Sequence, residues 1–435
     1  MYRTLIAPVN VRFEITGACT HLCKHCYNFW REQSGVKYQH PHLSVDNSRI
    51  IIDKLAEAQV FRVTITGGEP MMNYDVLIET ARQARLRGMS VGLNSNLILL
   101  NEKRVLELKE VGINHILTSI LGPSSLVHDE IAQAKGSFNL LIEKMKVAKI
   151  GGIEVTTNMV VSKLNLDYVY QTAKMLHELG LTKFIATKVG CPGNCSDFSE
   201  FRLSQVEMEK YLFDLSRIHN ELGMVVDILE PIPYCALTKV PNFELFAKRH
   251  CTAGVSTFTV SYDGTVRPCS HVDVQLGNIL NESITDVWSR MSSWRNGDYV
   301  PVRCKTCQAL QLCGAGCRME GKTFNGCLSD EDPYIDYSSV PSIIKLLQQR
   351  QKQNSDDVQR FMIKPIKLRL EEFGAVICLG SNVTCIDHNG LSVISQLEPK
   401  VIYDLSSSDS KINWAGIDPQ GFVRGLIFRG FATRV

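Results

Sequence analysis

Three cysteines near the N-terminus form the first group of residues that could do chemistry. They are Cys19, Cys23 and Cys26, in the order Cys-x3-Cys-x2-Cys, and Tyr27 follows directly. Thiolates at this spacing can fold one short loop around a metal centre. Each iron of a [4Fe–4S] cluster takes a thiolate, so three cysteines leave one iron open to a ligand that the protein does not supply. The alternatives are a zinc site, which prefers four protein ligands, and three buried cysteines without metal.

A second group of cysteines lies past residue 230. Cys251 is followed after twelve residues by Gly264 and after four more by Cys269, and Cys235 precedes them. Further along are Cys304-x2-Cys307-x5-Cys313-x3-Cys317 and then Cys327. These eight thiols would suffice for two four-sulfur sites. Few apolar residues surround them, so we expect metal binding to supply much of the folding energy, on the order of 10–16 kcal/mol for structural zinc peptides. Zinc remains an alternative here, because Cys-x2-Cys pairs also bind zinc.

A glycine-rich turn, Gly67-Gly68-Glu69-Pro70, follows a strand-like run. Two glycines let the backbone approach a ligand closely, and the neighbouring carboxylate can pair with an ammonium group. Later loops carry other polar groups, namely Asn94, Ser119 and the thiol pair Cys191 and Cys195. The thiols could donate a hydrogen atom, carry a substrate adduct or bind metal, and an ordinary loop pair is the alternative. We expect His21, His25, His40 and His42, which border the first cysteine loop, to be solvated.

Alternating strands and helices must position these groups. We predict strands at Val11–Thr16, Arg62–Thr66, Val91–Asn94, His115–Ile120, Glu154–Val161 and Lys183–Val189. Between and after them we predict amphipathic helices at Ser48–Ala58, Asp75–Arg87, Lys103–Val111, Phe138–Ile150, Leu166–Leu179 and Gln205–Leu222. Such units form a parallel α/β barrel or open sheet with helices outside. Chemistry is expected at the carboxyl ends of its strands, where each of these polar groups falls.

Composition narrows the class of protein. The chain has 435 residues, a net charge of +2 and fifteen cysteines. The charge gives no case for binding nucleic acid or an anionic membrane. No apolar run is long enough to span a membrane and the start lacks a secretion signal, so we expect a cytoplasmic protein. In a reducing compartment this many clustered cysteines indicate metal or redox chemistry rather than disulfides.

The first cysteine loop, placed after a first strand, resembles the signature of radical S-adenosylmethionine (SAM) enzymes. The resemblance implies a partial (β/α)6 barrel and a cluster whose open iron holds SAM, which an electron cleaves to a 5′-deoxyadenosyl radical. Gly67, Gly68, Glu69 and Pro70 look like the family's motif for the SAM amino group. Asn94 and Ser119 match its ribose contacts, and Tyr27 its adenine contact. The Ile120-Leu121-Gly122-Pro123 loop departs from the Asp-Gly that the family often has there.

The second cysteine group resembles the SPASM extension of peptide-modifying radical SAM enzymes, which carries two auxiliary [4Fe–4S] clusters. By this resemblance Cys251, Cys269 and Cys317 hold the first auxiliary cluster, with Cys235 as the candidate fourth ligand or else an open iron. Cys304, Cys307, Cys313 and Cys327 hold the second. Val255–Val260 and Thr265–Arg267 read as a hairpin closed by an Asp-Gly turn.

We expect three domains: the barrel over 1–230, the auxiliary-cluster domain over 231–337, and a linker helix with a small β-rich tail over 338–435. In the tail we predict strands at Ile366–Leu370, Ala375–Leu379 and Thr384–Asp387, a helix over 390–397, and a last strand at Phe422–Phe428. The tail weakly resembles the winged-helix module that binds leader peptides on a sheet edge. A structural cap is the alternative.

The resemblance implies radical-based modification of a ribosomally made precursor peptide. Two auxiliary clusters suit a net oxidation, which favours cross-linking or backbone splicing. Alternatives are a sulfatase-maturating enzyme that forms formylglycine, a peptide epimerase, or a non-catalytic zinc or electron-transfer protein. The implied partners are the peptide, an external electron donor such as flavodoxin or ferredoxin, and a separate peptide-recognition protein.

Overall fold

The computed structural model describes residues 3–28, 42–191, 198–353, 357–380, 382–405 and 412–435, with only the backbone for 349–353. It divides into two compact units. The first spans Ala7–Ile343, and the second comprises Arg3–Ile6 and Ile344–Val435. Within the described residues, no helix has both the length and the apolar character needed to cross a membrane.

The first unit is built on one sheet with the strand order β7-β6-β5-β4-β3-β2-β1-β8-β9. All neighbours from β7 to β8 pair in parallel, and β8 and β9 form an antiparallel hairpin. The strands are β1 (Asn10–Glu14), β2 (Arg62–Thr66), β3 (Ser90–Asn94), β4 (His115–Ser119), β5 (Glu154–Val161), β6 (Lys183–Lys188), β7 (Val225–Asp227), β8 (Thr257–Val260) and β9 (Val266–Arg267).

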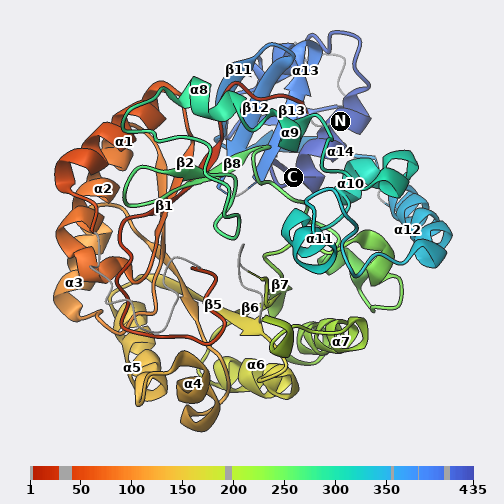
Figure 1. Ribbon diagram of the computed structural model, residues 1–435. Coiled ribbons are helices and arrows are strands. Elements are labelled where there is room, and N and C mark those ends of the chain that lie inside the picture. The colour runs from red at the N-terminus through yellow and green to blue at the C-terminus, as the bar shows by residue number, and fades with distance from the viewer. Residues whose placement is uncertain (1–2, 29–41, 192–197, 354–356, 381, 406–411) are drawn as a thin grey trace. The chain divides into compact units, whose positions relative to one another are not determined.

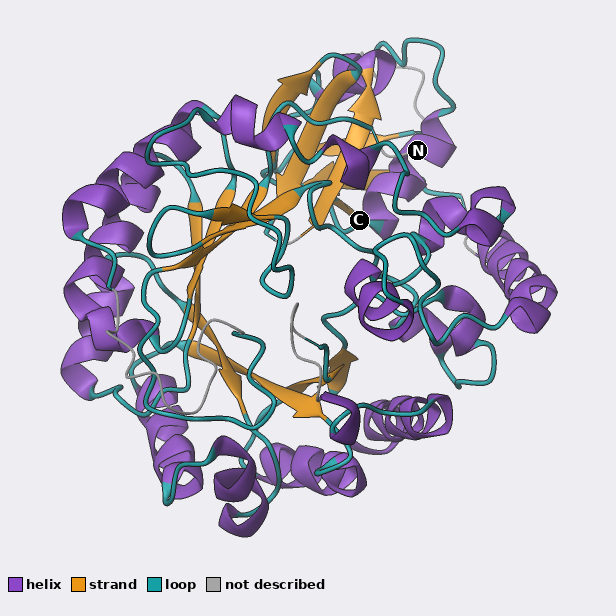
Figure 2. Cartoon of the chain, viewed as in Figure 1, coloured by secondary structure: helices purple, strands orange, loops and turns teal. Residues whose placement is uncertain are grey.

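Helices form an outer layer around this curved sheet, as Figures 1 and 2 show. The layer contains α1 (Val45–Glu57), α2 (Tyr74–Leu86), α3 (Glu102–Glu110), α4 (Ser125–Ala132), α5 (Ser137–Ile150), α6 (Val169–Glu178) and α7 (Gln205–Leu222). The predicted α/β partial-barrel class is confirmed, and each predicted strand and helix of this region is present to within about three residues. The sequence analysis missed α4 and β7.

Local signals explain where the helices begin and end. Ser204 begins α7 with a capping box, because its side chain accepts from the Glu207 backbone while the Glu207 carboxylate accepts from the Ser204 N–H. Gly223 ends α7 in the left-handed conformation, at φ 65°. Ser44 caps α1 in the same manner by accepting from Asn47.

The cysteine-rich part of the first unit follows β7 and is joined to the barrel by the predicted hairpin. The sequence analysis predicted this hairpin but not that β8 would pair with β1 and so extend the barrel sheet. Short helices follow: α8 (Ile284–Ser289), α9 (Ser292–Arg295), α10 (Leu310–Cys313) and α11 (Arg318–Asn325). Cys313 ends α10, and Cys317 directly precedes α11. The helix α12 (Val340–Gln353) leads into the second unit.

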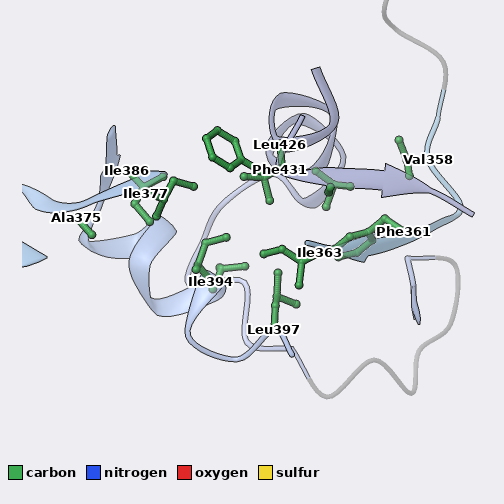
Figure 3. Close-up of a cluster of buried hydrophobic side chains, with 13 residues drawn as sticks. Val358, Phe361, Ile363, Ala375, Ile377, Ile386, Ile394, Leu397, Leu426 and Phe431 are labelled. Atoms are coloured by element: carbon green, nitrogen blue, oxygen red, sulfur yellow. The ribbon is translucent and has the colours of Figure 1, made fainter. Parts of the chain in front are cut away.

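The second unit contains two antiparallel three-stranded sheets, with the orders β14-β10-β15 and β11-β12-β13. Its elements are β10 (Arg360–Ile363), β11 (Lys367–Glu371), β12 (Gly374–Leu379), β13 (Asn382–Asp387), α13 (His388–Ile394), β14 (Ile402–Asp404), α14 (Pro419–Phe428) and β15 (Ala432–Arg434). Figure 3 shows its apolar core, in which Phe361, Ile394 and Leu426 come together from different elements.

One tail prediction was wrong. Phe422–Phe428 lies within the helix α14 and is not a strand. The aromatic and β-branched run suggested a strand, but Asp418 and Pro419 begin a helix. Pro419 occupies the first turn, and the Asp418 carboxylate accepts from the backbone of Gln420 and Gly421.

A buried ion pair joins the hairpin to the barrel. Arg267 of β9 donates to Glu14 of β1 at 2.5 Å, and Ser261 donates to the same carboxylate oxygen at 3.1 Å. Both charged side chains are almost fully buried. Burial raises the pKa of Glu14, and the Arg267 guanidinium opposes that shift.

We expect Arg267→Met to destabilise the first unit by about 3–5 kcal/mol, because it leaves a buried carboxylate without its partner. Adding Glu14→Leu to Arg267→Met should recover much of this loss. Urea denaturation of the reconstituted protein, followed by circular dichroism, measures both. The control is Arg217→Ala, which breaks a solvent-exposed pair with Glu221 and should lower the stability far less, because water screens exposed ion pairs. Equal costs for the buried and exposed pairs would contradict the prediction.

Candidate functional site

The first cysteine loop leaves the carboxyl end of β1 and is held in place by its own backbone. The N–H groups of Leu22 and Lys24 donate to the carbonyls of Ala132 and Ile131, at 3.2 and 3.0 Å. Within the loop, Cys26 donates to the Cys23 carbonyl at 3.1 Å. Cys19, Cys23 and Cys26 are all partly exposed. The loop therefore presents three accessible thiols at the end of the sheet where chemistry was expected.

The glycine turn packs directly on this loop. Gly68 donates to the Thr16 carbonyl at 2.8 Å, and Glu69 donates to the Ala18 carbonyl at 2.7 Å. A Cβ atom at Gly68 would lie 2.0 Å from the Ala18 carbonyl oxygen. Gly67 has φ 133°, and a Cβ there would lie 2.5 Å from the Thr16 oxygen. Both positions therefore need glycine, as the sequence suggested, but the close approach that the structure shows is to the cysteine loop.

The Glu69 carboxylate braces two loops. It is buried and accepts from the Met71 N–H at 3.0 Å, the Ser95 hydroxyl at 2.8 Å and the Asn96 N–H at 2.7 Å. Burial raises its pKa, while these hydrogen bonds favour the charged form. Its role in the structure is to tie the loop after β2 to the loop after β3, with Pro70 beginning a short 3-10 turn between them. A contact of this motif with SAM stays a prediction.

Asn96 is a functional candidate that the sequence analysis did not assign. Its side-chain amide donates to the Thr20 hydroxyl at 2.8 Å and lies 3.8 Å from the Cys19 sulfur. Hydrogen bonds to cysteine sulfurs are one of the factors that set the potential of an iron–sulfur cluster. Its position two residues past Asn94, at the end of β3, was the available signal.

The remaining predicted SAM contacts also lie at strand ends. Asn94 ends β3, and Ser119 ends β4 opposite Asn158 of β5. Asn158 in turn accepts from the Thr187 hydroxyl of β6 at 2.7 Å. This gives a row of polar side chains across three neighbouring strands, in a region suited to hydrogen-bonding a nucleoside. The roles of Asn94 and Ser119 in binding the ribose of SAM stay predictions.

His271 joins the auxiliary-cluster region to the site. Its ring centroid lies 5.0 Å from that of Tyr27, the predicted adenine contact. A Cβ at Gly190 would lie 3.3 Å from His271 Nε2. Burial lowers the pKa of His271 to about 3, and Arg12 contributes. The position of His271 two residues after Cys269 gave no hint that it would reach the loop after β6.

Of the two cysteines predicted as catalytic, Cys191 and Cys195, the structure describes only Cys191. Cys191 is buried and packs against Val189 and Phe198. Cys195 lies outside the described residues. The catalytic role of both stays a prediction.

Two of the four loop histidines contradict the expectation of solvation. His21 and His25 are buried, at 7% and 9% exposure, and they share their environment with His128 of α4. Burial lowers the pKa of His25 to about 4, and the His128 charge adds to the effect. His42 is exposed and hydrogen-bonds Thr16. His40 lies outside the described residues.

The first predicted auxiliary site gathers its three cysteines. The pKa of the Cys269 thiol and that of the Cys317 thiol are both raised, mainly by burial and next by the charge of Cys251. Because the charge of Cys251 affects the pKa of both other thiols, Cys251 lies near Cys269 and near Cys317. The role of this trio as cluster ligands stays a prediction.

The second predicted auxiliary site differs from the expectation in one member. A pocket with an empty volume of about 390 Å³ is lined by Cys304, Cys307 and Cys313 together with Cys235. The sequence analysis assigned Cys235 to the other site. Cys327, predicted as the fourth thiol here, is exposed and does not line the pocket.

The spacing of these thiols bears on the choice of metal. Among the described residues, no three His, Cys, Asp or Glu side chains are grouped closely enough to hold a single metal ion. Four thiolates on one zinc lie within about 4 Å of each other, because a Zn–S bond is about 2.3 Å. A [4Fe–4S] cluster places each thiolate on a different iron and spaces the sulfurs more widely. Sulfur spacing is therefore the property that distinguishes a cluster site from a zinc site in these two groups.

A buried charged network lies beside Cys317. Lys188, at the end of β6, donates to Glu320 of α11 at 2.8 Å, and both side chains are almost fully buried. The Lys188 N–H also donates to Glu230 at 2.6 Å. Asp332 accepts from the Cys317 N–H at 2.8 Å. Burial raises the pKa of Glu230 to about 7 and that of Asp332 to about 6, while Lys188 opposes both shifts. The network links the barrel to the first auxiliary site.

Comparisons with known proteins agree with this geometry. Residues 13–176 match the radical SAM superfamily, and residues 251–308 match the SPASM iron–sulfur cluster-binding domain. The chain is therefore a radical SAM enzyme, whose cofactors are [4Fe–4S] clusters and SAM. More particularly, it carries a SPASM domain in addition to its radical SAM domain.

Relatives and solved structures extend this match. The AdoMet-dependent heme synthase of Oleidesulfovibrio alaskensis is 25% identical over 342 residues, covering 75% of this chain and 87% of the relative. The PqqA peptide cyclase of Ruegeria pomeroyi is 25% identical over 345 residues, covering 76% and 87%. Native anSMEcpe with bound AdoMet and a Kp18Cys peptide superposes with a TM-score of 0.61 at 16% identity, covering 79% and 99%. Streptococcus suis SuiB bound to precursor peptide SuiA gives 0.60 at 15%, covering 76% of each chain.

We expect Gly68→Ala to weaken SAM binding at least about tenfold, or about 1.4 kcal/mol, because the added Cβ would push the glycine turn off the cysteine loop. Equilibrium dialysis of the reconstituted protein measures this. The matched control is Gly425→Ala in α14, where only the end of the flexible Arg429 side chain is near. Unchanged affinity in Gly68→Ala would contradict the prediction.

We expect Asn96→Ala to lower the midpoint potential of the SAM-binding cluster by on the order of tens of millivolts, because it removes an N–H donor near the Cys19 sulfur. A redox titration followed by electron paramagnetic resonance measures the potential. Thr20→Val is the control, since it removes the other partner of Asn96 and leaves the amide beside Cys19. Equal potentials in both variants would argue against a role for Asn96.

Proposed function

We propose that this enzyme modifies a ribosomally synthesised precursor peptide. The observation that carries the proposal is the sheet β11-β12-β13 of the second unit. Among the described residues no further strand pairs with its edge strand β13, whose Asn382 and Val383 are exposed. An unpaired edge can take up an extended peptide through backbone hydrogen bonds. The second unit would thereby serve as the peptide-recognition module.

The named relatives and structural neighbours support the same substrate class. The relatives include PqqA peptide cyclases, and the neighbours include two enzymes whose structures contain peptides. Because the neighbours are less than 25% identical, their peptides serve as support for the proposal and not as its proof.

The proposal assigns roles to individual residues of the chain. Cys19, Cys23 and Cys26 hold the SAM-binding cluster, and the backbone of the turn Gly67–Pro70 lies beside it. When bound, the cluster and SAM supply a 5′-deoxyadenosyl radical for hydrogen abstraction. Tyr27, Asn94 and Ser119 orient the nucleoside at the strand ends. Cys191 follows β6, where it would meet a substrate radical, and Cys195 is four residues further along the chain.

We infer that the reaction is a net oxidation, such as cross-linking or backbone splicing. Two auxiliary clusters provide acceptors for the electron that such a reaction releases. An external donor such as flavodoxin or ferredoxin would reduce the SAM-binding cluster, and a separate recognition protein could help to present the peptide. Formylglycine formation and epimerisation on a peptide are the alternatives within this class.

A second candidate is the maturation of a tetrapyrrole. The observation that favours it is the 25% identity to AdoMet-dependent heme synthases, which extends over most of their length. The two candidates differ in the substrate that the site must admit, a flexible peptide or a flat macrocycle.

We expect the anaerobically reconstituted and reduced protein to convert SAM to 5′-deoxyadenosine, and a cognate precursor peptide to raise the rate at least about tenfold. Mass spectrometry detects the nucleoside and any mass change in the peptide. A variant with Cys19, Cys23 and Cys26 all changed to Ala should form none, because it cannot hold the cluster. Cys385→Ala, a thiol of the second unit, is the control and should retain activity.

The choice of substrate decides between the candidates. Stimulation by a tetrapyrrole precursor, with no response to precursor peptides, would favour the second candidate. Removal of 344–435 should abolish the response to peptide and leave the basal cleavage of SAM. If the shortened protein still modifies the peptide at the original rate, the second unit is not the recognition module.

A further inference from the structure

Four cysteines from three separate segments line one pocket in the auxiliary-cluster region. A 3-10 turn at Val302–Thr306 carries Cys304 and leads to Cys307, and Cys313 ends α10. The fourth, Cys235, comes from the earlier turn Tyr234–Leu237, almost seventy residues before. The pocket's empty volume is about 390 Å³, and apart from the thiols it is lined mainly by apolar and aromatic side chains.

The electrostatics of the thiols agree with this grouping. The pKa of Cys235 is raised to about 12, mainly by burial and next by the charges of Cys313 and Cys304. Burial raises the pKa of Cys313 to about 11, and Cys304 and Cys307 add to it. These four thiols are therefore close enough for the charge of one to affect the pKa of another.

Hydrogen-bond donors already point at these sulfurs. The Tyr234 N–H donates to the Cys313 sulfur at 3.3 Å. The Tyr337 hydroxyl lies 3.8 Å from the Cys304 sulfur, but its proton is donated to the Glu331 carboxylate at 2.7 Å. The Asp336 backbone N–H donates to Cys235 and favours its thiolate. Donors of this kind stabilise thiolates that ligate iron. Cys235 and Cys313 thus each accept a hydrogen bond from a backbone N–H.

Cys327 has none of these features. It is exposed, it lies outside the pocket, and its backbone N–H is bonded to the Asp330 carboxylate at 2.8 Å. It follows the C-terminal end of α11, whereas Cys317 precedes the N-terminal end. Eight residues of helix, about 12 Å, separate it from Cys317 and hence from the first auxiliary site.

We propose that Cys235, Cys304, Cys307 and Cys313 ligate the second auxiliary cluster, and that Cys327 is not a cluster ligand. Each ligating thiol loses its proton to solvent when the cluster binds. The assignment takes Cys235 away from the first auxiliary site and leaves Cys251, Cys269 and Cys317 as its cysteine ligands. It does not depend on the substrate of the enzyme, so its failure and the failure of the peptide proposal are separate results.

Differential alkylation tests the assignment without any turnover. The fully reconstituted protein and the cluster-free protein are treated anaerobically with iodoacetamide, and each cysteine is followed by peptide mass spectrometry. We expect Cys327 to react equally in both states. The alkylation rate of Cys235 should be at least about tenfold lower in the reconstituted protein than in the cluster-free protein. Protection of Cys327 by the clusters, or equal labelling of Cys235 in both states, would overturn the proposal.

Matched variants give a second readout in case burial alone shields Cys235 from the reagent. Cys235→Ser and Cys327→Ser are each made in a protein whose Cys19, Cys23 and Cys26 are Ala, so that only auxiliary iron remains. We expect Cys235→Ser either to lose one cluster's iron or to show a distinct oxygen-ligated iron in its Mössbauer spectrum. Cys327→Ser should match its parent in iron content and spectrum. The reverse pattern, or two unchanged spectra, would overturn the proposal.

Discussion

The site depends on the contact between two backbones, those of the loops that follow β1 and β2. Gly68 lies so close to the Ala18 carbonyl that no side chain fits between them. This contact fixes the cysteine loop against the glycine turn, and the Glu69 carboxylate extends the bracing to the loop after β3. Three successive loops at one end of a parallel sheet are thereby held as a unit. A cluster that must meet SAM in one orientation needs such preorganisation, because small displacements of reacting groups are costly.

A second constraint joins the two halves of the first unit. The hairpin β8–β9 extends the barrel sheet, because β8 pairs with β1. The buried ion pair between Arg267 and Glu14 fixes the position of the hairpin on the sheet, although burying two charges costs desolvation energy. The hairpin leads on to Cys269 and then His271, so the same docking brings His271 to Tyr27. Lys188 and Glu320 form a comparable buried link beside Cys317. The auxiliary-cluster region is therefore coupled to the barrel mouth by directional polar contacts rather than by apolar packing alone.

Much of this arrangement could be predicted from the sequence. Regular hydrophobic periods and glycine caps indicated the strands and helices of the barrel, and the spacing around Cys19 indicated a cluster with an open iron. Side-chain partners between distant segments were not predictable. The position of Asn96 at the end of β3 placed it at the functional end of the sheet, but its contact with Cys19 could not be predicted. The histidines beside the loop were expected in solvent, and α4, which supplies His128, was missed. The helix at Phe422 was mistaken for a strand because composition outweighed the cap at Asp418 and Pro419.

The choice between Cys235 and Cys327 shows why spacing alone cannot assign ligands. A loop closed from Cys235 to Cys304 is roughly five times as long as one closed from Cys313 to Cys327. In a flexible chain that difference costs only about 1.4 kcal/mol. Other contacts of the cysteine-rich region already hold the segment around Cys235, since the Tyr234 hydroxyl donates to the Ala247 carbonyl and the Tyr234 N–H to the Cys313 sulfur. The entropic advantage of the nearer thiol is then largely removed. Cys327, held by Asp330 beyond α11, would have to give up that position to reach the pocket.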